Sequence, residues 1–221
     1  MKLDVISKSE SARYMGIKGE PDEVIAGILD KYEEIVRNQL KPAYVYRETS
    51  LVMCDDGIRI NGINTLFTGN DIKKHLKGCE RVIIFAATVS ATADKLIRQV
   101  SVTDTAAALA VDCLCSAAIE QVCDKAEQEI FTEIPAPYRT WRFSPGYGDL
   151  PISLQKDLLL FLNAQRRIGL TVTESCMMIP SKSVTAIIGI SDFPQGHQKK
   201  GCDICNMRAS CGFRYNGGCG R

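Results

Sequence analysis

Residues 142–189 read RFSPGYGDLPISLQKDLLLFLNAQRRIGLTVTESCMMIPSKSVTAIIG, and this stretch carries the strongest structural signals of the chain. A turn-rich segment, SPGYGDLP, comes first. A helical pattern over residues 153–167 follows, and then two β-prone runs, LTVTES and VTAIIGIS. We expect a short strand at 138–143 to lead into the turn. The stretch therefore predicts a helix framed by strands.

The chain before this stretch contains two further helical patterns. Apolar residues recur at three- and four-residue spacing after Pro21 and again after Asp104. Proline suits a first helical turn and aspartate suits an N-cap, whereas Pro42 and Pro135 mark the helix ends. The buried stripe of the second, long helix is predicted to be Val111, Leu114, Ala118, Ile119, Val122, Ala126 and Ile130.

Strand-like runs lie between these two helices. They are AYVYRE, LVMCDD, IRING and RVIIFAATV, at 43–48, 51–56, 58–62 and 81–89. The last run is continuously apolar, which favours a central strand covered on both faces. Residues 68–71, TGND, resemble the cap of a short helix over 72–78. The chain is therefore predicted to be one α+β domain over residues 1–193, with a Cys-rich tail over 194–221.

Composition excludes several classes of protein. The 221 residues are 45% hydrophobic and 24% charged, which excludes a disordered chain. The net charge of +1 excludes a general nucleic-acid binder, because no overall positive field exists to hold phosphates. The first residues contain no long apolar run, and later runs such as VIIFAATV fall short of a membrane span. We expect a cytoplasmic protein without a membrane or nucleic-acid partner.

The ten cysteines fall into two groups. Six are scattered through the helical and strand patterns, where free thiols act as small hydrophobes, so a reducing compartment is expected. The others are Cys202, Cys205, Cys211 and Cys219 in the tail. Four thiolates with one two-residue spacing suit a zinc ion or an iron–sulfur cluster. The sequence leaves three readings open: iron–sulfur, zinc, or no metal.

The segment after Arg142 has the composition of a small-ligand loop. Gly146 and Gly148 flank Tyr147, so backbone can approach a ligand beside a flat ring. Pro145 stiffens the loop, and the planar guanidinium of Arg142 suits a carboxylate. The alternative is that Pro-Gly-Tyr-Gly is only a turn.

The same residues resemble a known family, the activation domain of cobalamin-dependent methionine synthase. The family pattern is an Arg, then Pro-Gly-Tyr, a helix, a Thr-Glu-Ser strand, a Met and a Pro, and a Ser-Val strand. The matching residues here are Arg142, Pro145, Gly146, Tyr147, Thr173, Glu174, Ser175, Met178, Pro180, Ser183 and Val184. The resemblance extends more weakly over residues 10–190. It differs at 152–156, where ISLQK replaces the His-Thr-Glu-Lys stretch of the synthases.

The resemblance implies a fold and a function. The fold would be α+β, with a central twisted, mainly antiparallel sheet packed by helices. The chain would be a stand-alone homologue that binds S-adenosylmethionine as methyl donor. It would assist the reductive methylation of cobalamin on a separate methionine synthase or corrinoid methyltransferase, with electrons from a donor such as ferredoxin or flavodoxin. Its own role would be positioning and exclusion of water, without a catalytic acid or base.

The resemblance also assigns binding residues. Arg142 would hold the ligand carboxylate, Tyr147 the adenosyl part or the sulfonium-bearing chain, and Ser144, Pro145 and Gly146 lie between them. Glu120, on the long helix, is a candidate for the ligand ammonium. The alternative for Glu120 is an ordinary solvated helix residue.

Other functions remain open. A binding or regulatory module could keep the fold and serve another ligand, or the tail could make the protein a small redox or metal-handling factor. The two histidines, His75 and His197, have no spacing that suggests a nucleophile or a metal site. His75, beside two lysines on a short helix, is predicted to lie at the surface.

Overall fold

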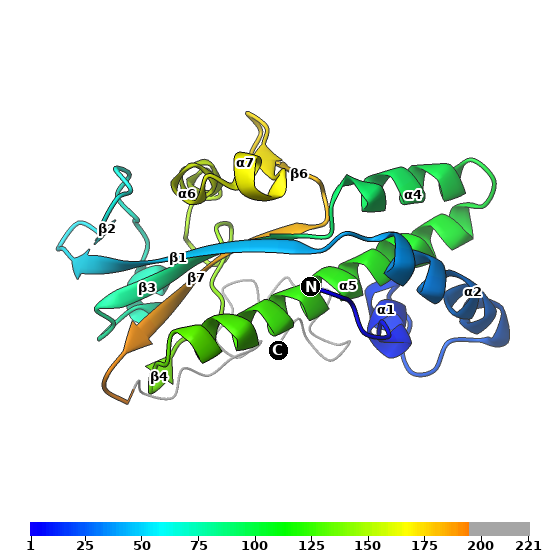
Figure 1. Ribbon diagram of the computed structural model, residues 1–221, viewed down its shortest axis with the longest axis horizontal. Helices are drawn as coiled ribbons and strands as arrows, with labels where there is room; N and C mark the ends of the chain where they lie inside the picture. The colour runs from blue at the N-terminus through cyan, green and yellow to red at the C-terminus, as the bar shows by residue number, and fades with distance from the viewer. Residues whose placement is uncertain (195–221) are drawn as a thin grey trace. The chain divides into compact units, whose positions relative to one another are not determined.

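The computed structural model describes residues 1–194, which contain both helices and strands, labelled in Figure 1. The helices are α1 (Lys8–Tyr14), α2 (Glu23–Gln39), α3 (Asn70–His75), α4 (Ala91–Ser101), α5 (Thr105–Glu133), α6 (Leu154–Leu162) and α7 (Ala164–Ile168). The strands are β1 (Ala43–Met53), β2 (Ile58–Ile60), β3 (Arg81–Thr88), β4 (Tyr138–Arg139), β5 (Thr171–Val172), β6 (Met178–Ile179) and β7 (Ser183–Ser191). The predicted α+β class is confirmed.

The larger sheet is antiparallel and has the strand order β2-β1-β3-β7-β4. β1 pairs antiparallel with β2, and β4 with β7. Just before β1, the Lys41 N–H donates to the Val89 carbonyl at 3.2 Å. Within β1, the Leu51 N–H donates to the Glu80 carbonyl at 3.0 Å. Because the partner's number falls as the chain advances, β1 and β3 are also antiparallel.

β3 is the strand that the sequence predicted most closely. Every residue from Val82 to Val89 is buried, as expected for a continuous apolar run with neighbours on both edges. β1 was predicted as two runs, AYVYRE and LVMCDD, and is one strand of eleven residues. The polar Glu48 and Thr49 do not interrupt it.

The chain divides into two compact units, each assembled from three segments. The first contains Met1–Val45, Ala86–Ile130 and Ala164–Val184. The second contains Tyr46–Phe85, Phe131–Asn163 and the chain from Thr185. Strands β1, β3 and β7 each contribute residues to both units. The predicted boundary at residue 193 stays a prediction, because residues 195–221 lie outside the described part.

The first unit is built on α5. The Asp104 carboxylate accepts the Ala107 N–H at 2.9 Å, which confirms the predicted N-cap. All residues of the predicted stripe are buried, together with Ala107, Ala110, Cys113, Cys115, Ala117 and Cys123. Small residues on its remaining faces therefore let α5 be covered on more than one side.

α5 is also the one helix in the described part that is long and apolar enough to cross a membrane. Its most apolar window has a mean hydropathy of 1.5, and 67% of that window is buried inside the protein. The sequence analysis found no apolar run long enough to span a membrane, and so it did not identify this helix as a candidate. Since the core helix of a folded domain passes the same test, the finding is weak evidence for a membrane span.

Three elements of the first unit were not predicted, α1, α4 and the short strand β6. α1 packs against α2, and α2 packs against α4. α2 begins one residue after its cap, Asp22, whose carboxylate accepts the Ile25 N–H at 2.8 Å.

The helix predicted over 153–167 is two helices, because Asn163 adopts a left-handed conformation with φ of 52° between them.

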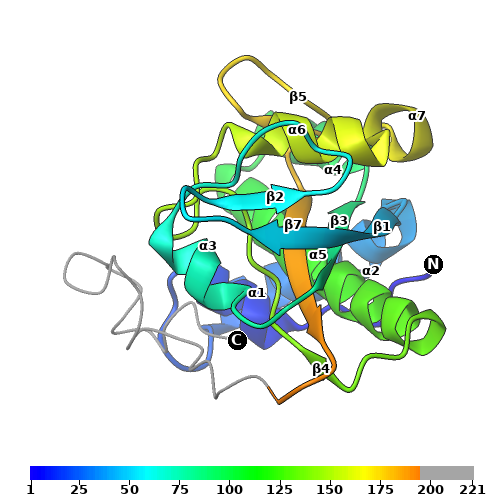
Figure 2. The same ribbon diagram turned by 90° about the vertical axis from the view of Figure 1, so that its left-hand side faces the viewer.

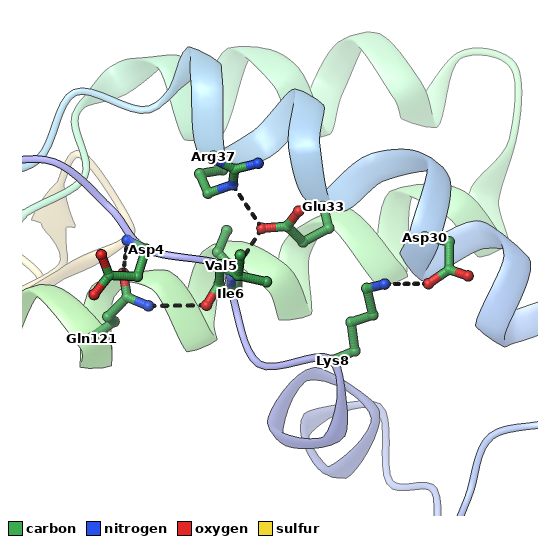
Figure 3. A network of polar contacts seen from close by, with 8 residues as sticks. All are labelled: Asp4, Val5, Ile6, Lys8, Asp30, Glu33, Arg37 and Gln121. Atoms are coloured by element: carbon green, nitrogen blue, oxygen red, sulfur yellow. Dashed lines mark hydrogen bonds and ion pairs between the residues drawn. The ribbon is translucent and has the colours of Figure 1, made fainter.

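A polar network fixes the extended N-terminal segment in the first unit (Figure 3). The buried Glu33 carboxylate on α2 accepts the Ile6 N–H at 2.9 Å and the Arg37 Nε–H at 3.0 Å. The Gln121 amide on α5 accepts the Asp4 N–H and donates to the Val5 carbonyl, at 2.9 and 3.2 Å. The side chains of Glu33 and Gln121 thus form the hydrogen bonds to the backbone of residues 4–6 that a neighbouring β-strand would otherwise form.

The second unit contains β2, α3, β4 and α6 with most of β1, β3 and β7. Figure 2 shows β2 beside β1, where Leu51 pairs with Ile60. Gly62, at the predicted Asn-Gly turn, has φ of +85°. A Cβ at Gly62 would lie 2.8 Å from Phe161 Cε2, so the turn requires glycine on two counts.

We predict that Glu33→Ala lowers the free energy of unfolding by about 1–3 kcal/mol. The substitution leaves the buried Ile6 N–H without its acceptor. Asp30→Ala is the matched control, because it removes an α2 carboxylate whose ion pair with Lys8 is exposed. The control should change the unfolding free energy by less than about 1 kcal/mol. Chemical denaturation measures both, and equal losses would contradict a special role for Glu33.

Candidate functional site

The predicted ligand residues other than Glu120 lie in one continuous segment of the second unit, Arg142–Tyr147, which we call the motif loop. Its first part is fixed to β7, because the backbones of Phe143 and Ile187 exchange two hydrogen bonds of 3.0 and 2.8 Å. Phe143 is buried, and Arg142 and Ser144 on either side of it are half-buried. Since neighbours in extended chain point to opposite sides, Arg142 and Ser144 share the side away from Phe143.

The second part of the motif loop is a tight turn closed by its own backbone. The Tyr147 N–H donates to the Ser144 carbonyl at 3.1 Å, and the Gly146 N–H to the Leu150 carbonyl at 2.9 Å. Gly146 has φ of +91°, and a Cβ there would lie 3.3 Å from Ile152 Cδ1. The turn therefore favours glycine and presents bare backbone beside the Tyr147 side chain, which is 56% exposed.

The aromatic side chains of the motif loop pack against His75 and Trp141. The His75 ring centroid is 4.6 Å from that of Trp141 and 4.8 Å from that of Phe143. Phe143 in turn lies 6.3 Å from Tyr147. His75 is only 3% exposed, so its predicted surface position is wrong. The short helix turns Ile72, His75 and Leu76 inward and leaves Lys74 exposed. The neighbouring lysines in the sequence had suggested a surface position for His75 as well.

The cap of α3 was also assigned wrongly. The residue before the helix is Gly69, which has no side chain to cap it. Instead, the Asp149 carboxylate accepts the N–H groups of Asn70 and Asp71 at 2.6 and 3.0 Å. A partner 79 residues away along the chain replaces the predicted local cap.

Arg142, Ser144, Pro145, Gly146 and Tyr147 are neighbours in the sequence and share the motif loop, in which Pro145 is buried, and their role as ligand residues stays a prediction. Glu120 lies on α5 in the first unit and is half-buried, so its predicted role stays a prediction. The tail cysteines, Cys202, Cys205, Cys211 and Cys219, and His197 lie outside the described residues. In the part of the chain that is described, no group of three or more His, Cys, Asp or Glu side chains is placed to hold a metal ion.

A second polar cluster, in the first unit, was missed by sequence reasoning. The Lys182 ammonium donates to the Asp112 carboxylate at 2.8 Å and to the Ser116 hydroxyl at 2.9 Å. The Asp94 carboxylate on α4 accepts the N–H and hydroxyl of Ser181. These contacts fasten the start of β7 to α4 and α5. The only signal for them in the sequence is the one-turn spacing of Asp112 and Ser116.

The cysteines in the described part are free thiols. Burial raises the pKa of Cys79 and Cys113 to about 11 and that of Cys115 to about 12. The thiolate is the nucleophile, so these buried side chains are unreactive near neutral pH. Cys54 and Cys176 are half-exposed.

We predict that iodoacetamide at pH 8 alkylates Cys54 and Cys176 in the folded protein and spares Cys79, Cys113 and Cys115. A raised pKa keeps the thiol protonated, so raising the pH from 7 to 9 should leave the three protected. Peptide mass spectrometry measures each site, with the unfolded protein as the control in which all react. Rapid modification of Cys115 before unfolding would contradict the structure.

Comparison with protein families matches residues 72–195, more than half of the chain, to the family described as "Vitamin B12 dependent methionine synthase, activation domain". The matched range includes the C-terminal part of α3, the motif loop and β7. No curated protein sequence matches the chain.

Comparison with solved structures finds similarity to the crystal structure of the MetH reactivation domain bound to AdoHcy. The TM-score is 0.67 and the sequence identity 13%, over 87% of this chain and 76% of that one. At this identity the likeness establishes the fold. It confirms the α+β architecture with an antiparallel sheet that the resemblance implied.

Proposed function

Because the chain belongs to the family of the vitamin B12-dependent methionine synthase activation domain, we propose that it binds S-adenosylmethionine on the motif loop. We further propose that it presents this methyl donor for reductive methylation of a protein-bound cobalamin. The observation that carries the proposal is the loop itself, in which a half-buried arginine, an exposed tyrosine and bare glycine backbone converge within six residues.

Arg142 has the chemistry to select the amino-acid end of the ligand. Its guanidinium offers parallel N–H donors that match a carboxylate, and partial burial strengthens such a pair. Phe143 anchors the neighbouring backbone to β7, so the arginine starts from a fixed position. Ser144, beside it, contributes a hydroxyl that can donate or accept a hydrogen bond.

Tyr147 and the glycines suit the rest of the ligand. An exposed aromatic ring can stack on adenine or contact the positively charged sulfonium through its face. Gly146 adds no side chain, so a ligand can lie against its backbone, and Pro145 lowers the entropy lost when the loop is ordered. Glu120 remains a candidate for the ligand ammonium.

The chemistry requires a cobalamin-carrying protein and an electron donor. The cobalt takes up one electron and the methyl group, and S-adenosylhomocysteine leaves. We propose a methionine synthase or corrinoid methyltransferase as the partner, and a ferredoxin or flavodoxin as the donor. The related solved domain holds AdoHcy, the product of such a transfer, which supports the choice of ligand. The free thiols support a reducing, cytoplasmic compartment.

This role requires little acid–base chemistry from the residues of the chain. S-adenosylmethionine is already an activated methyl donor, so its residues need to bind it, orient its methyl group and keep water away. The loop offers a charged anchor, a ring and rigid backbone for these tasks.

We predict that Arg142→Ala weakens S-adenosylmethionine binding by about 1.5–3 kcal/mol, because a charge-assisted pair is lost. Arg139→Ala is the matched control. It removes an arginine three residues away that stacks on Phe131 at 4.2 Å, and it should bind like the parent. Isothermal titration calorimetry measures all three proteins. Equal weakening in both variants, or no binding heat in the parent, would overturn the proposal.

Methyl transfer itself is tested with a cobalamin protein in its cobalt(II) form, an electron donor and S-adenosylmethionine. Addition of this chain should convert the visible spectrum to that of methylcobalamin, and Arg142→Ala should slow the conversion. Binding without any conversion would instead favour the reading of a binding or regulatory module.

A further inference from the structure

The helix α3 contacts the chain on both sides of the motif loop. It has six residues, and isolated helices of this length are unstable in water. Its N-terminus has no side-chain cap of its own. α3 therefore depends on tertiary contacts: it buries Ile72 and Leu76, Lys73 donates to the Asp55 carbonyl, and both ends of the helix contact the segment around the motif loop.

At the first end of α3, Asp149 holds the helix to the residues that follow the motif loop. Its carboxylate accepts two backbone N–H groups of the first turn, at 2.6 and 3.0 Å. Two glycines leave room for the carboxylates of the opposite segment: a Cβ at Gly69 would lie 2.5 Å from Asp149 Oδ1, and a Cβ at Gly148 would overlap Asp71 Oδ2. In Figure 2, α3 lies beside the yellow-green chain that leads to α6.

At the other end of α3, His75 supports the residues that precede the turn of the motif loop. Its ring packs edge-on against Trp141 and tilted against Phe143. α3 is thus tied to the chain before and after the turn of the motif loop: His75 contacts Trp141 and Phe143, and Asp149 holds the first turn of the helix. Ile72 and Leu76, both 0% exposed, fix α3 itself in the core of the second unit.

We propose that α3 sets the conformation of the motif loop, with Asp149 and His75 as positioning residues for Arg142 and Tyr147. This inference rests on the proposed function for its ligand. Neither residue contacts the ligand. They act by fixing the distance between the arginine and the tyrosine before binding, so that less conformational entropy is lost on binding.

The first test removes the Asp149 carboxylate. Asp149→Ala should weaken S-adenosylmethionine binding at least ten-fold and speed amide exchange at Gly146 and Leu150, whose N–H groups close the turn. Asp149→Asn keeps an acceptor oxygen and should restore part of both. Asp22→Ala removes an equivalent cap from α2 in the first unit and should leave loop exchange and affinity unchanged.

The second test addresses the His75 end. Trp141 is the single tryptophan of the chain, so its emission reports this contact directly. His75→Ala should shift that emission and weaken binding, whereas His75→Phe, which keeps an aromatic ring, should recover most of the affinity. Far-UV circular dichroism checks that each variant is folded.

Exchange and emission are measured without ligand, which separates this inference from the proposed function. If the parent fails to bind S-adenosylmethionine while Asp149→Ala speeds exchange only in the loop, the function is wrong and the support by α3 stands. If folded Asp149→Ala and His75→Ala keep parental loop exchange and affinity, the inference is overturned. The same holds if Asp22→Ala disturbs the loop as much.

Discussion

The continuous burial of β3 is the constraint on which the rest of the structure depends. The side chains from Val82 to Val89 are all buried, so water is kept away from both faces of β3. Its backbone N–H and C=O groups therefore need hydrogen-bond partners in a strand on each edge. β1 and β7 take those places. β7 then offers its other edge to the chain that follows α5, where Phe143 pairs with Ile187. The position of the motif loop is therefore a consequence of how the sheet is completed.

The elements that sequence reasoning predicted well are those whose signal is local. β3 and α5 carry long apolar patterns, and their burial agrees with those patterns residue by residue. The errors have equally physical causes. Val24, one of the apolar residues that recur after Pro21, is exposed, whereas the charged Glu33 is buried, because Glu33 has backbone and arginine partners. Such pairing depends on tertiary contacts that periodicity does not report.

In the candidate site, too, the local features could be predicted from the sequence and the tertiary contacts could not. Its residues could be named from the sequence because the motif is contiguous and glycine, proline, tyrosine and arginine have distinct properties. The support under it could not be predicted. In the sequence, Asp149 looks like an ordinary turn residue, and His75 lies among lysines. In the structure, Asp149 accepts a hydrogen bond from α3, and His75 on α3 packs against Phe143 of the motif loop, so both contacts join residues far apart in the chain. The residues matched to the family include the motif loop, and the structure supplies what stabilises the loop.

The central claim is that the motif loop receives the methyl donor, and a crystal structure with S-adenosylhomocysteine bound tests it most directly. The account predicts the carboxylate of the ligand at hydrogen-bond distance, about 3 Å, from the Arg142 guanidinium. It also predicts ligand atoms against the Gly146 backbone and the Tyr147 ring. A ligand bound elsewhere on the protein, with Arg142 and Tyr147 untouched, would contradict it.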